Sequence, residues 1–359
     1  MSAHRSAKHE NAATTKPLLL TMGDAAGIGP EIIAKAFRDA PTELAGCVVV
    51  GDVPTLRRAA ALMAAPLAWP VVQLDSLAET HLVPPGAIPV LQKCELPTLI
   101  PFGLVNGLAG QAAADCVVWA ARAVLAAEAA GMVTAPLHKE ALAAAGGWAA
   151  NFPGHTEMLQ AEAAAFQGKA VSEVPVRMML ANTEIKTVLV SIHLALRDAI
   201  EAVTFDGVLQ TLRITHQALI ASLGRAPRIA VAGLNPHAGE GGRFGSEEQS
   251  TIAPAIAAAR IEGMDVTGPI APDTVFMRAR NTAHKPGEFD VVVAMYHDQG
   301  LIPVKYLGIE QGVNVTLGLP LVRTSPDHGT AFDIAGTGRA DASSLIAAVQ
   351  MARQLAKLK

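Results

Sequence analysis

The stretch "DVVVAMYHDQGLIPVKY", residues 290–306, shows the pattern on which the fold prediction depends. Its first half is apolar, as is typical of a buried strand, and the strand ends at His297 and Asp298, with Lys305 eight residues after the histidine. The same design, an apolar strand followed by a polar turn, recurs in "GMVTAPL", "KTVLVSIHL" and "RIAVAGLNPHA". Helical segments separate these strands, so the pattern predicts an α/β fold with a largely parallel sheet, in which ligands gather at the carboxyl ends of strands.

The amino-terminal part of the chain favours the same fold class. A strand is predicted at 17–22, a glycine loop at 23–29, and a helix at 30–40 with Pro30 at its first position, where a missing N–H costs little. The loop lacks the G-x-G-x-x-G spacing, so we predict neither a Rossmann domain nor a pyrophosphate cradle there. Residues 81–110 contain Pro and Gly but are too apolar for a tether, which predicts irregular and edge structure.

The composition describes a globular chain with a small partner. The 359 residues are 51% hydrophobic and 17% charged, which excludes disorder and allows two domains or one two-lobed unit. A net charge of -4 lacks the excess of positive charge that is typical of proteins that bind nucleic acid or an anionic membrane. Three cysteines, Cys47, Cys94 and Cys116, have neither metal-ligand nor redox-motif spacing, so we expect small buried apolar residues.

Residues 1–16 are polar and without periodicity, which predicts a disordered tail. They lack the hydrophobic stretch of a secretory signal, and we expect no apolar run long enough to span a bilayer. We therefore expect a cytoplasmic protein that does not interact with membranes.

Three histidines follow strand-like runs: His193, His237 and His297. For each one alone, a satisfied core or surface histidine is the simpler interpretation, and their spacings form no local metal motif. In one sheet, however, three strand ends can converge on one cleft, where three imidazoles suit zinc or a related divalent ion. Such an ion stabilises negative charge on a substrate oxygen, which fits the oxidation of an alcohol.

A second group of polar residues points to an anionic ligand. Lys305, Asn314 and Arg323 stand among apolar residues and resemble a clamp for phosphate or carboxylate, although isolated surface charges would be the simpler interpretation. His155 and Thr156 form a polar turn in "FPGHTEML", where Thr156 could also cap a helix. Both roles can hold together, because a helix N-terminus favours anions.

Several stretches carry a resemblance to a known family: "TMGDAAGIGPEI", "TAPLHKEAL", "FPGHTEML", "GLNPHAGEGGRFGSEE", "GPIAPDTVF" and "AMYHDQGLIPVKYLGIEQGVNVTLGLPLVRTSPDHGTAFDIAGTG". Together, and in order from Leu18 to the end, they resemble the 4-hydroxythreonine-4-phosphate dehydrogenase (PdxA) family. The resemblance implies metal ligation by the three histidines, with one histidine donated by the neighbouring chain of a homodimer whose active sites lie at the subunit interface. It also implies that substrate contacts His155, Thr156, Lys305, Asn314 and Arg323.

Two stretches, "GDAAGIGPE" and "DHGTAFDIAGTG", look like segments of isocitrate and isopropylmalate dehydrogenases. This likeness implies two α/β/α lobes with a cleft between them. Residues 17–150 and 322–359 would form the outer lobe, and 151–321 the inner lobe with the metal and dimer contacts. NAD or NADP would lie in the cleft, and its adenosine half would be held by His328, Gly329, Thr330 and Asp333.

The implied chemistry is an oxidation followed by decarboxylation. A divalent metal, with zinc first and Mg, Mn or Co as alternatives, would activate a secondary hydroxyl for hydride transfer to the nicotinamide. The resulting β-keto acid would then lose carbon dioxide. Lys305 and Asp298 are the predicted catalytic side chains, and whether Asp298 orients a ligand or transfers a proton stays open.

The substrate is predicted less narrowly than the chemistry. The first expectation is 4-phosphooxy-L-threonine, the substrate of pyridoxine biosynthesis. Departures such as Arg243, where histidine is common, look more like a branch that oxidises 4-phosphoerythronate or 4-phosphothreonate, and a terephthalate cis-dihydrodiol is a further alternative. A metabolite-binding dimer without activity is the non-enzyme alternative. A short-chain reductase is disfavoured, because the chain has no Tyr-x-x-x-Lys pair.

Overall fold

The computed structural model describes residues 16–63 and 69–357, so the tail predicted at 1–16 lies, Lys16 apart, outside the described residues. The described strands form one sheet in the order β3-β4-β2-β1-β5-β12-β11-β6-β7-β10-β8-β9. The strands are β1 (Leu18–Thr21), β2 (Cys47–Gly51), β3 (Val71–Leu74), β4 (Ile88–Gln92), β5 (Gly131–Thr134), β6 (Arg177–Ala181), β7 (Lys186–Leu189), β8 (Ile229–Ala232), β9 (Val266–Ile270), β10 (Val291–Ala294), β11 (Val313–Leu317) and β12 (Arg323–Pro326).

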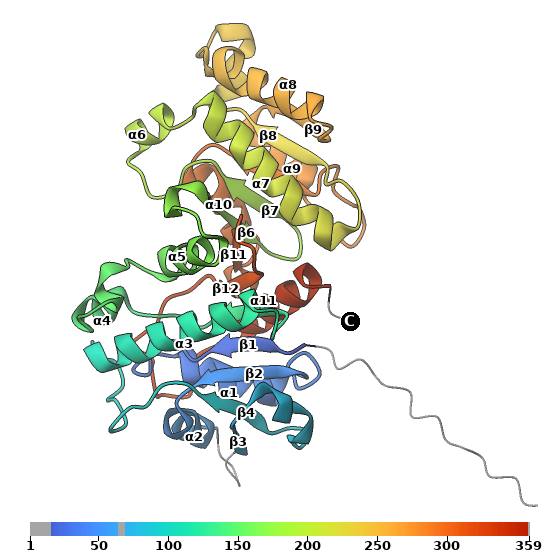
Figure 1. Cartoon of the computed structure of the whole chain (residues 1–359). Coiled ribbons are helices and arrows are strands. Elements are labelled where there is room, and N and C mark those ends of the chain that lie inside the picture. Colours follow the sequence, from blue (N-terminus) through green and yellow to red (C-terminus); the bar gives the residue numbers. More distant parts are fainter. Residues whose placement is uncertain (1–15, 64–68, 358–359) are drawn as a thin grey trace, which may run out of the picture.

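Helices cover both faces of this sheet, which confirms the predicted α/β class. The α-helices are α1 (Gly29–Asp39), α2 (Val53–Ala61), α3 (Gly107–Leu125), α4 (Lys139–Ala144), α5 (His155–Gln167), α6 (Leu196–Glu201), α7 (Phe205–Leu223), α8 (Ala253–Ile261), α9 (Pro272–Ala279), α10 (His297–Tyr306) and α11 (Ser343–Leu355). Figure 1 shows α7 on one face of β7 and α10 on the other. The predicted helix after the glycine loop is α1, which begins at Gly29, one residue before Pro30.

The sheet has two parallel halves that run in opposite directions. From β3 to β12 neighbouring strands are parallel, and they are parallel again from β7 to β9. Between them, β12 with β11, β11 with β6 and β6 with β7 are antiparallel. These three antiparallel pairings reverse the strand direction, so the predicted parallel sheet is interrupted at its centre. We call the antiparallel stretch from β12 to β7 the seam.

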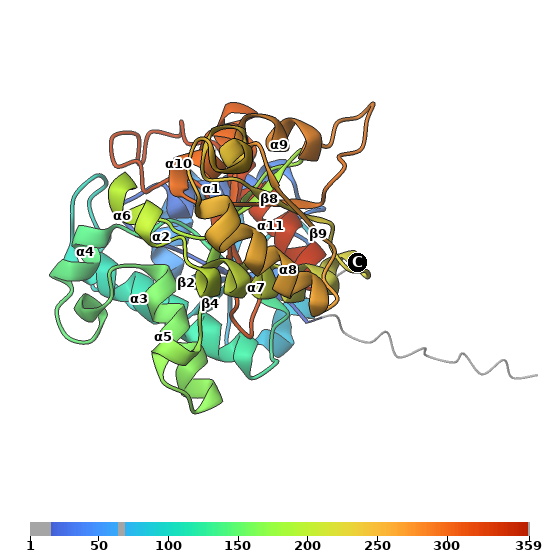
Figure 2. The ribbon, with the colours of Figure 1, turned by 90° about the horizontal axis from the view of Figure 1, so that it is seen from above.

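Apolar strands fit their place in the sheet. Leu18, Leu19 and Leu20 of β1 are fully buried, because a central parallel strand is covered by helices on both faces and needs no polar side. The carboxyl-terminal helix α11 packs against β5 and β12, so both ends of the chain meet in the blue and red half of Figure 1. Seen from above, α4 and α6 lie on the same side of the molecule (Figure 2).

Three expectations about individual segments are settled by the structure. The stretch 81–110 is not only irregular and edge structure, because it contains β4, which lies between β3 and β2. Helix α3 is long and apolar enough to span a membrane, against the expectation, but 67% of its apolar window is buried in the protein, as in a core helix. The cysteines are buried and free, as predicted, and burial raises the pKa of Cys47 to about 12.

Candidate active site

A cavity of about 790 Å³ opens where β7 and β12 end and where α5 and α10 begin. We call it the site cavity. Every residue that the resemblance assigns to the substrate lines it: His155, Thr156, Lys305, Asn314 and Arg323. His193, His297 and His328 line it too. His155 and His328, which are 173 positions apart in the sequence, therefore share one cavity, because neighbouring strands and helix starts bring them to it.

Arg323 is the most buried cation of the site cavity, with only 4% of its surface exposed. Its Nη2 and Nε donate to Thr134 Oγ1 at 2.7 and 3.1 Å, and its Nη1 donates to Thr316 Oγ1 at 3.0 Å. Among the described residues these hydroxyls are its hydrogen-bond partners, and no carboxylate forms an ion pair with it. A buried guanidinium held by neutral groups leaves its charge available to an anion.

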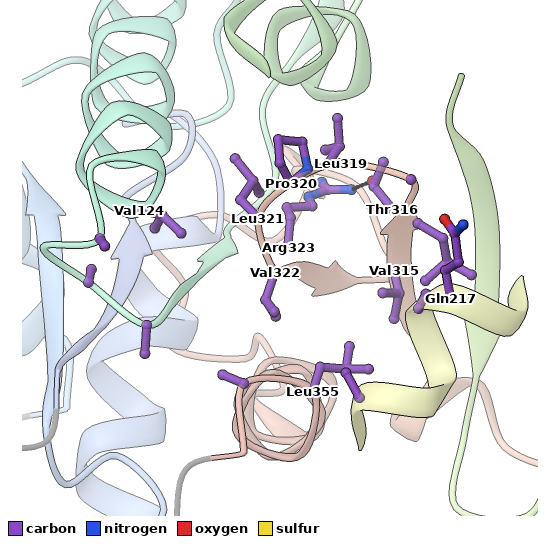
Figure 3. A pocket seen from close by; sticks show the side chains of 18 of the residues that line it. Val124, Gln217, Val315, Thr316, Leu319, Pro320, Leu321, Val322, Arg323 and Leu355 are labelled. Atoms are coloured by element: carbon purple, nitrogen blue, oxygen red, sulfur yellow. Dashed lines mark hydrogen bonds between the residues drawn. The ribbon is translucent and has the colours of Figure 1, made fainter. Parts of the chain in front are cut away.

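The surroundings of Arg323 explain its electrostatics. A second cavity, about 520 Å³, shares Arg323 and Thr316 with the site cavity, and its other walls are mainly apolar, among them Leu321 and Val322 (Figure 3). Burial between these walls lowers the pKa of Arg323 to about 10, against the opposing attraction of Glu157. Arg323 therefore stays cationic at neutral pH, but its charge is poorly screened by water.

His155 is the first residue of α5, next to this cation. Burial, followed by repulsion from Arg323, holds the pKa of His155 well below its usual value, so the imidazole is neutral. Its Nε2 is buried and has no hydrogen-bond partner in the described part of the chain. The predicted cap is wrong: α5 begins after Gly154, and the Thr156 side chain caps nothing. Both side chains line the cavity at a helix N-terminus, which favours an anion there.

Lys305 lies in the last turn of α10 and differs from Arg323 in having an anionic partner. Its Nζ lies 2.8 Å from Asp327 Oδ2, and Asp327 is 8% exposed against 39% for Lys305. The ion pair fixes the amine at the cavity wall while leaving it reachable. Asn314, on β11, also lines this cavity.

His193 and His297 come together as predicted from the strand ends. Their ring centroids lie 5.8 Å apart. His297 Nδ1 lies 2.7 Å from Asp298 Oδ1, which holds the proton on Nδ1 and leaves Nε2 free to bind a metal. A smaller cavity of about 290 Å³ contains both rings and Asp298. We call His193 and His297 the histidine pair.

His237 does not join the histidine pair within one chain. It lies in the turn after β8, Pro236–Gly242, where its exposed ring neighbours Phe244 at 6.1 Å between centroids. Within the described ranges, no group of three His, Cys, Asp or Glu residues is arranged to hold a metal. The expectation that all three strand ends converge is thus met for two of them, and donation of His237 to a neighbouring chain stays a prediction.

The residues predicted for the cofactor are spread along one loop. His328 lines the site cavity, whereas Asp333 is exposed and does not line it. Thr330 is buried against the amino-terminal glycine loop, where its carbonyl accepts a hydrogen bond from Ile28 N at 3.0 Å. A side chain at Gly27 would lie 2.9 Å from Thr330 Cβ, so the glycine allows the two loops to touch.

Three functional residues were missed by sequence reasoning. Thr134 and Thr316 hold Arg323, and Asp327 holds Lys305. Thr134 stands in the quoted stretch "TAPLHKEAL" at the end of a predicted strand, which was the available signal. Nothing in the sequence indicates that its hydroxyl faces an arginine 189 residues away.

Comparison with known proteins identifies relatives along nearly the whole chain. A family model described as "Pyridoxal phosphate biosynthetic protein PdxA" matches residues 43–352. A 4-hydroxythreonine-4-phosphate dehydrogenase from Beijerinckia indica is 53% identical over 94% of this chain and 95% of the relative. A D-threonate 4-phosphate dehydrogenase from Pectobacterium atrosepticum is 42% identical over 95% of this chain and 100% of the relative.

A solved structure agrees with these sequence matches. The crystal structure of 4-hydroxythreonine-4-phosphate dehydrogenase from Klebsiella pneumoniae superposes with a TM-score of 0.83, at 41% identity, over 96% of this chain and 99% of that one. Family model, relatives and fold therefore agree, and the chain belongs to the PdxA family.

Proposed function

We propose that this protein is a metal-dependent, NAD(P)-linked dehydrogenase that oxidises and decarboxylates a small anionic hydroxy acid, with 4-phosphooxy-L-threonine as the leading substrate. The observation that carries the proposal is the juxtaposition in one cavity of a buried, unneutralised cation and two neighbouring histidines. Relatives named as dehydrogenases of phosphorylated four-carbon acids support the same chemistry.

The donor set fits a divalent metal. His193 and His297 lie side by side, Asp298 fixes one tautomer, and the partner subunit's His237 would complete three nitrogen ligands for Zn²⁺, or for Mg²⁺, Mn²⁺ or Co²⁺. When bound, the metal would lower the pKa of the substrate hydroxyl, and NAD or NADP on the loop His328–Asp333 would accept the hydride. The orphaned buried Nε2 atoms of His155 and His328 mark polar sites that a ligand can satisfy.

The chain's own side chains would bind and orient the substrate. Arg323, Asn314 and the α5 N-terminus with His155 and Thr156 would hold an anionic end, which fixes the hydroxyl near the histidine pair. Lys305, held by Asp327, would donate to the carboxylate and move the proton that decarboxylation requires. Asp298 would orient His297 or transfer the proton of the hydroxyl.

Three expectations remain part of this proposal. The protein would be a homodimer with each active site at the subunit interface, which accounts for the position of His237. Its cavity would lie between an outer lobe, 17–150 with 322–359, and an inner lobe, 151–321. It would act in the cytoplasm, in pyridoxine biosynthesis if 4-phosphooxy-L-threonine is the preferred substrate.

The test is a substrate panel with purified protein, NAD or NADP, and each divalent metal in turn. Absorbance of the reduced cofactor is followed with 4-phosphooxy-L-threonine, 4-phosphothreonate, 4-phosphoerythronate and a terephthalate cis-dihydrodiol, while released carbon dioxide is trapped. The proposal expects turnover with a phosphorylated acid, and the R323A control should show a kcat/KM lower by about 1000-fold. Silence with every substrate would favour a non-catalytic metabolite-binding dimer.

The second candidate activity is oxidation of D-threonate 4-phosphate. It is favoured by the relative of that name, which is 42% identical over 95% of this chain and 100% of the relative. Arg243, exposed in the turn next to His237, is the departure from the pathway enzymes that fits this branch. Relative kcat/KM values for the two phosphorylated substrates decide between the activities.

A further inference from the structure

The turn that carries His237 has a backbone that L-amino acids rarely adopt. His237, Ala238 and Glu240 have φ angles of 52°, 52° and 41°, all in the left-handed region. Non-glycine residues persist there only when surrounding contacts enforce the conformation. The contacts that enforce this turn therefore determine where the His237 imidazole points.

A single buried carboxylate holds the backbone that leads into this turn. Glu248, in the π-helical turn Glu248–Ile252, is 3% exposed. Its Oε1 accepts hydrogen bonds from Leu234 N and Asn235 N, both at 2.7 Å, and its Oε2 accepts one from Asn235 Nδ2 at 2.9 Å. Within the described residues no lysine or arginine pairs with it, so backbone and amide N–H groups alone satisfy the charge.

Asn235 is fixed between two carboxylates by the same amide nitrogen. Besides Glu248, its Nδ2 donates to Glu247 Oε2 at 2.7 Å, so the amide can face these groups in one orientation only. The turn also wraps closely around Glu248, because a Cβ on Gly239 would lie 2.7 Å from Glu248 Oε2. Strand end, amide and carboxylate thus form one connected unit beneath His237.

We infer that Glu248 is a positioning residue for His237: through Asn235 and the backbone of residues 234 and 235 it holds the left-handed turn that presents the imidazole as a metal ligand. This inference rests on the proposed function, in which His237 binds the metal. Glu248 itself contacts neither metal nor substrate. Its removal acts on metal affinity through the orientation of His237.

The decisive variant is E248Q, which changes one atom. Glutamine cannot offer acceptors to both the backbone N–H groups and Asn235 Nδ2, so one donor faces another donor. Asn235 cannot relieve the conflict by flipping, because its Oδ1 would then face Glu247. In the double variant E247Q/E248Q, a flipped Asn235 can accept from both glutamine amides. The double variant therefore restores the hydrogen bonds of Asn235 that E248Q disrupts.

Zn²⁺ affinity of the full-length dimer is measured by competition with a chromophoric chelator, alongside circular dichroism and the thermal midpoint. We expect E248Q to bind Zn²⁺ at least about tenfold more weakly, as for other residues that orient a ligand, and E247Q/E248Q to return within about threefold of the parent. E247Q alone and E240Q, a change at an exposed carboxylate of the same turn, serve as controls and leave affinity unchanged.

Unchanged Zn²⁺ affinity in E248Q, or a double variant as weak as E248Q, would overturn the inference. If E248Q does not fold, the double variant decides: affinity within threefold supports the inference, and a tenfold loss overturns it. H237A distinguishes a failure of the proposed metal site from a failure of the role inferred for Glu248. If H237A binds Zn²⁺ as tightly as the parent, the proposed metal site is wrong, whereas loss in H237A without loss in E248Q rejects the role of Glu248 alone.

Discussion

Arg323 and the histidine pair line the same cavity but differ in burial and in completeness. Arg323 is 4% exposed, and in the described part of the chain it donates its hydrogen bonds to Thr134 and Thr316. His193 is exposed, and the third histidine of its proposed site lies elsewhere in the chain. The end that we propose for the anion is thus preorganised by the fold of one chain, whereas the proposed metal-binding end would need a second chain to be complete.

The largest effect is expected from breaking the preorganised end. R323A should lower kcat/KM about 1000-fold, because two charge-assisted hydrogen bonds to an anion are worth about 2 kcal/mol each. R323K should lower kcat/KM by an intermediate factor, about 30-fold, since lysine keeps the positive charge but lacks the planar guanidinium with its paired N–H donors. Steady-state kinetics with the phosphorylated substrate measure both, and equal activity of the two variants would contradict a bidentate role.

Assembly of the metal-binding end can be tested by mixing two inactive variants. H193A and H237A should each fall below about 1% of parent activity, given that even residues supporting a ligand cost up to 100-fold. Unfolding and refolding them together should restore about a quarter, because half of the dimers would be mixed and each mixed dimer would have one complete site. No recovery on mixing would mean that His237 acts within its own chain.

A smaller effect sharpens the description of the anion-binding end. T134V leaves two N–H groups of a buried guanidinium without acceptors, and T316V leaves one. We expect KM to rise about tenfold in T134V and about threefold in T316V. An unsatisfied buried donor costs about 1–3 kcal/mol, so a guanidinium that has lost its acceptors should leave the position in which it binds the anion. The reverse ranking would show that Thr316, not Thr134, orients Arg323.

The smallest effect concerns the neutral His155. Its pKa is lowered in the folded protein, so below an unfolded pKa of about 6.5 the unfolded state binds a proton that the folded state does not. Stability should therefore fall with decreasing pH below that value, by at most about 1.4 kcal/mol per pH unit from this residue. Urea unfolding of parent and H155Q between pH 5 and 7 should show a flatter dependence in H155Q, and parallel curves would contradict the assignment.

The contrast between the two ends also explains which parts could be predicted from the sequence. His193 and His297 each follow a continuous apolar strand, which is the pattern from which their proximity was predicted. In the structure β7 and β10 are neighbouring parallel strands, so the two rings lie close together. The position of His237 could not be predicted in the same way. Its strand β8 also neighbours β10, but the turn after β8 has left-handed backbone angles that no sequence pattern indicates, and we infer that Glu248 holds this turn.

The seam was the larger omission in the fold. Strands β6 and β11 were not predicted, and the antiparallel pairing of β6 with β11 joins residues more than 130 positions apart. Thr316 is brought to Arg323 by the antiparallel pairing of β11 with β12, and Thr134 by the parallel pairing of β5 with β12. Sequence patterns thus located the charged residues but not the neutral groups that hold them.

Arg323, Thr134 and Thr316 come from β12, β5 and β11, which lie side by side where the sheet reverses direction. An anion on Arg323 would therefore bind at the β12 end of the seam that joins the two parallel halves. Occupancy should slow amide hydrogen exchange in strands on either side of it, well beyond the residues in contact. The bound ligand would hold the neighbouring strands together, so the protein with ligand would open locally less often than the protein without it.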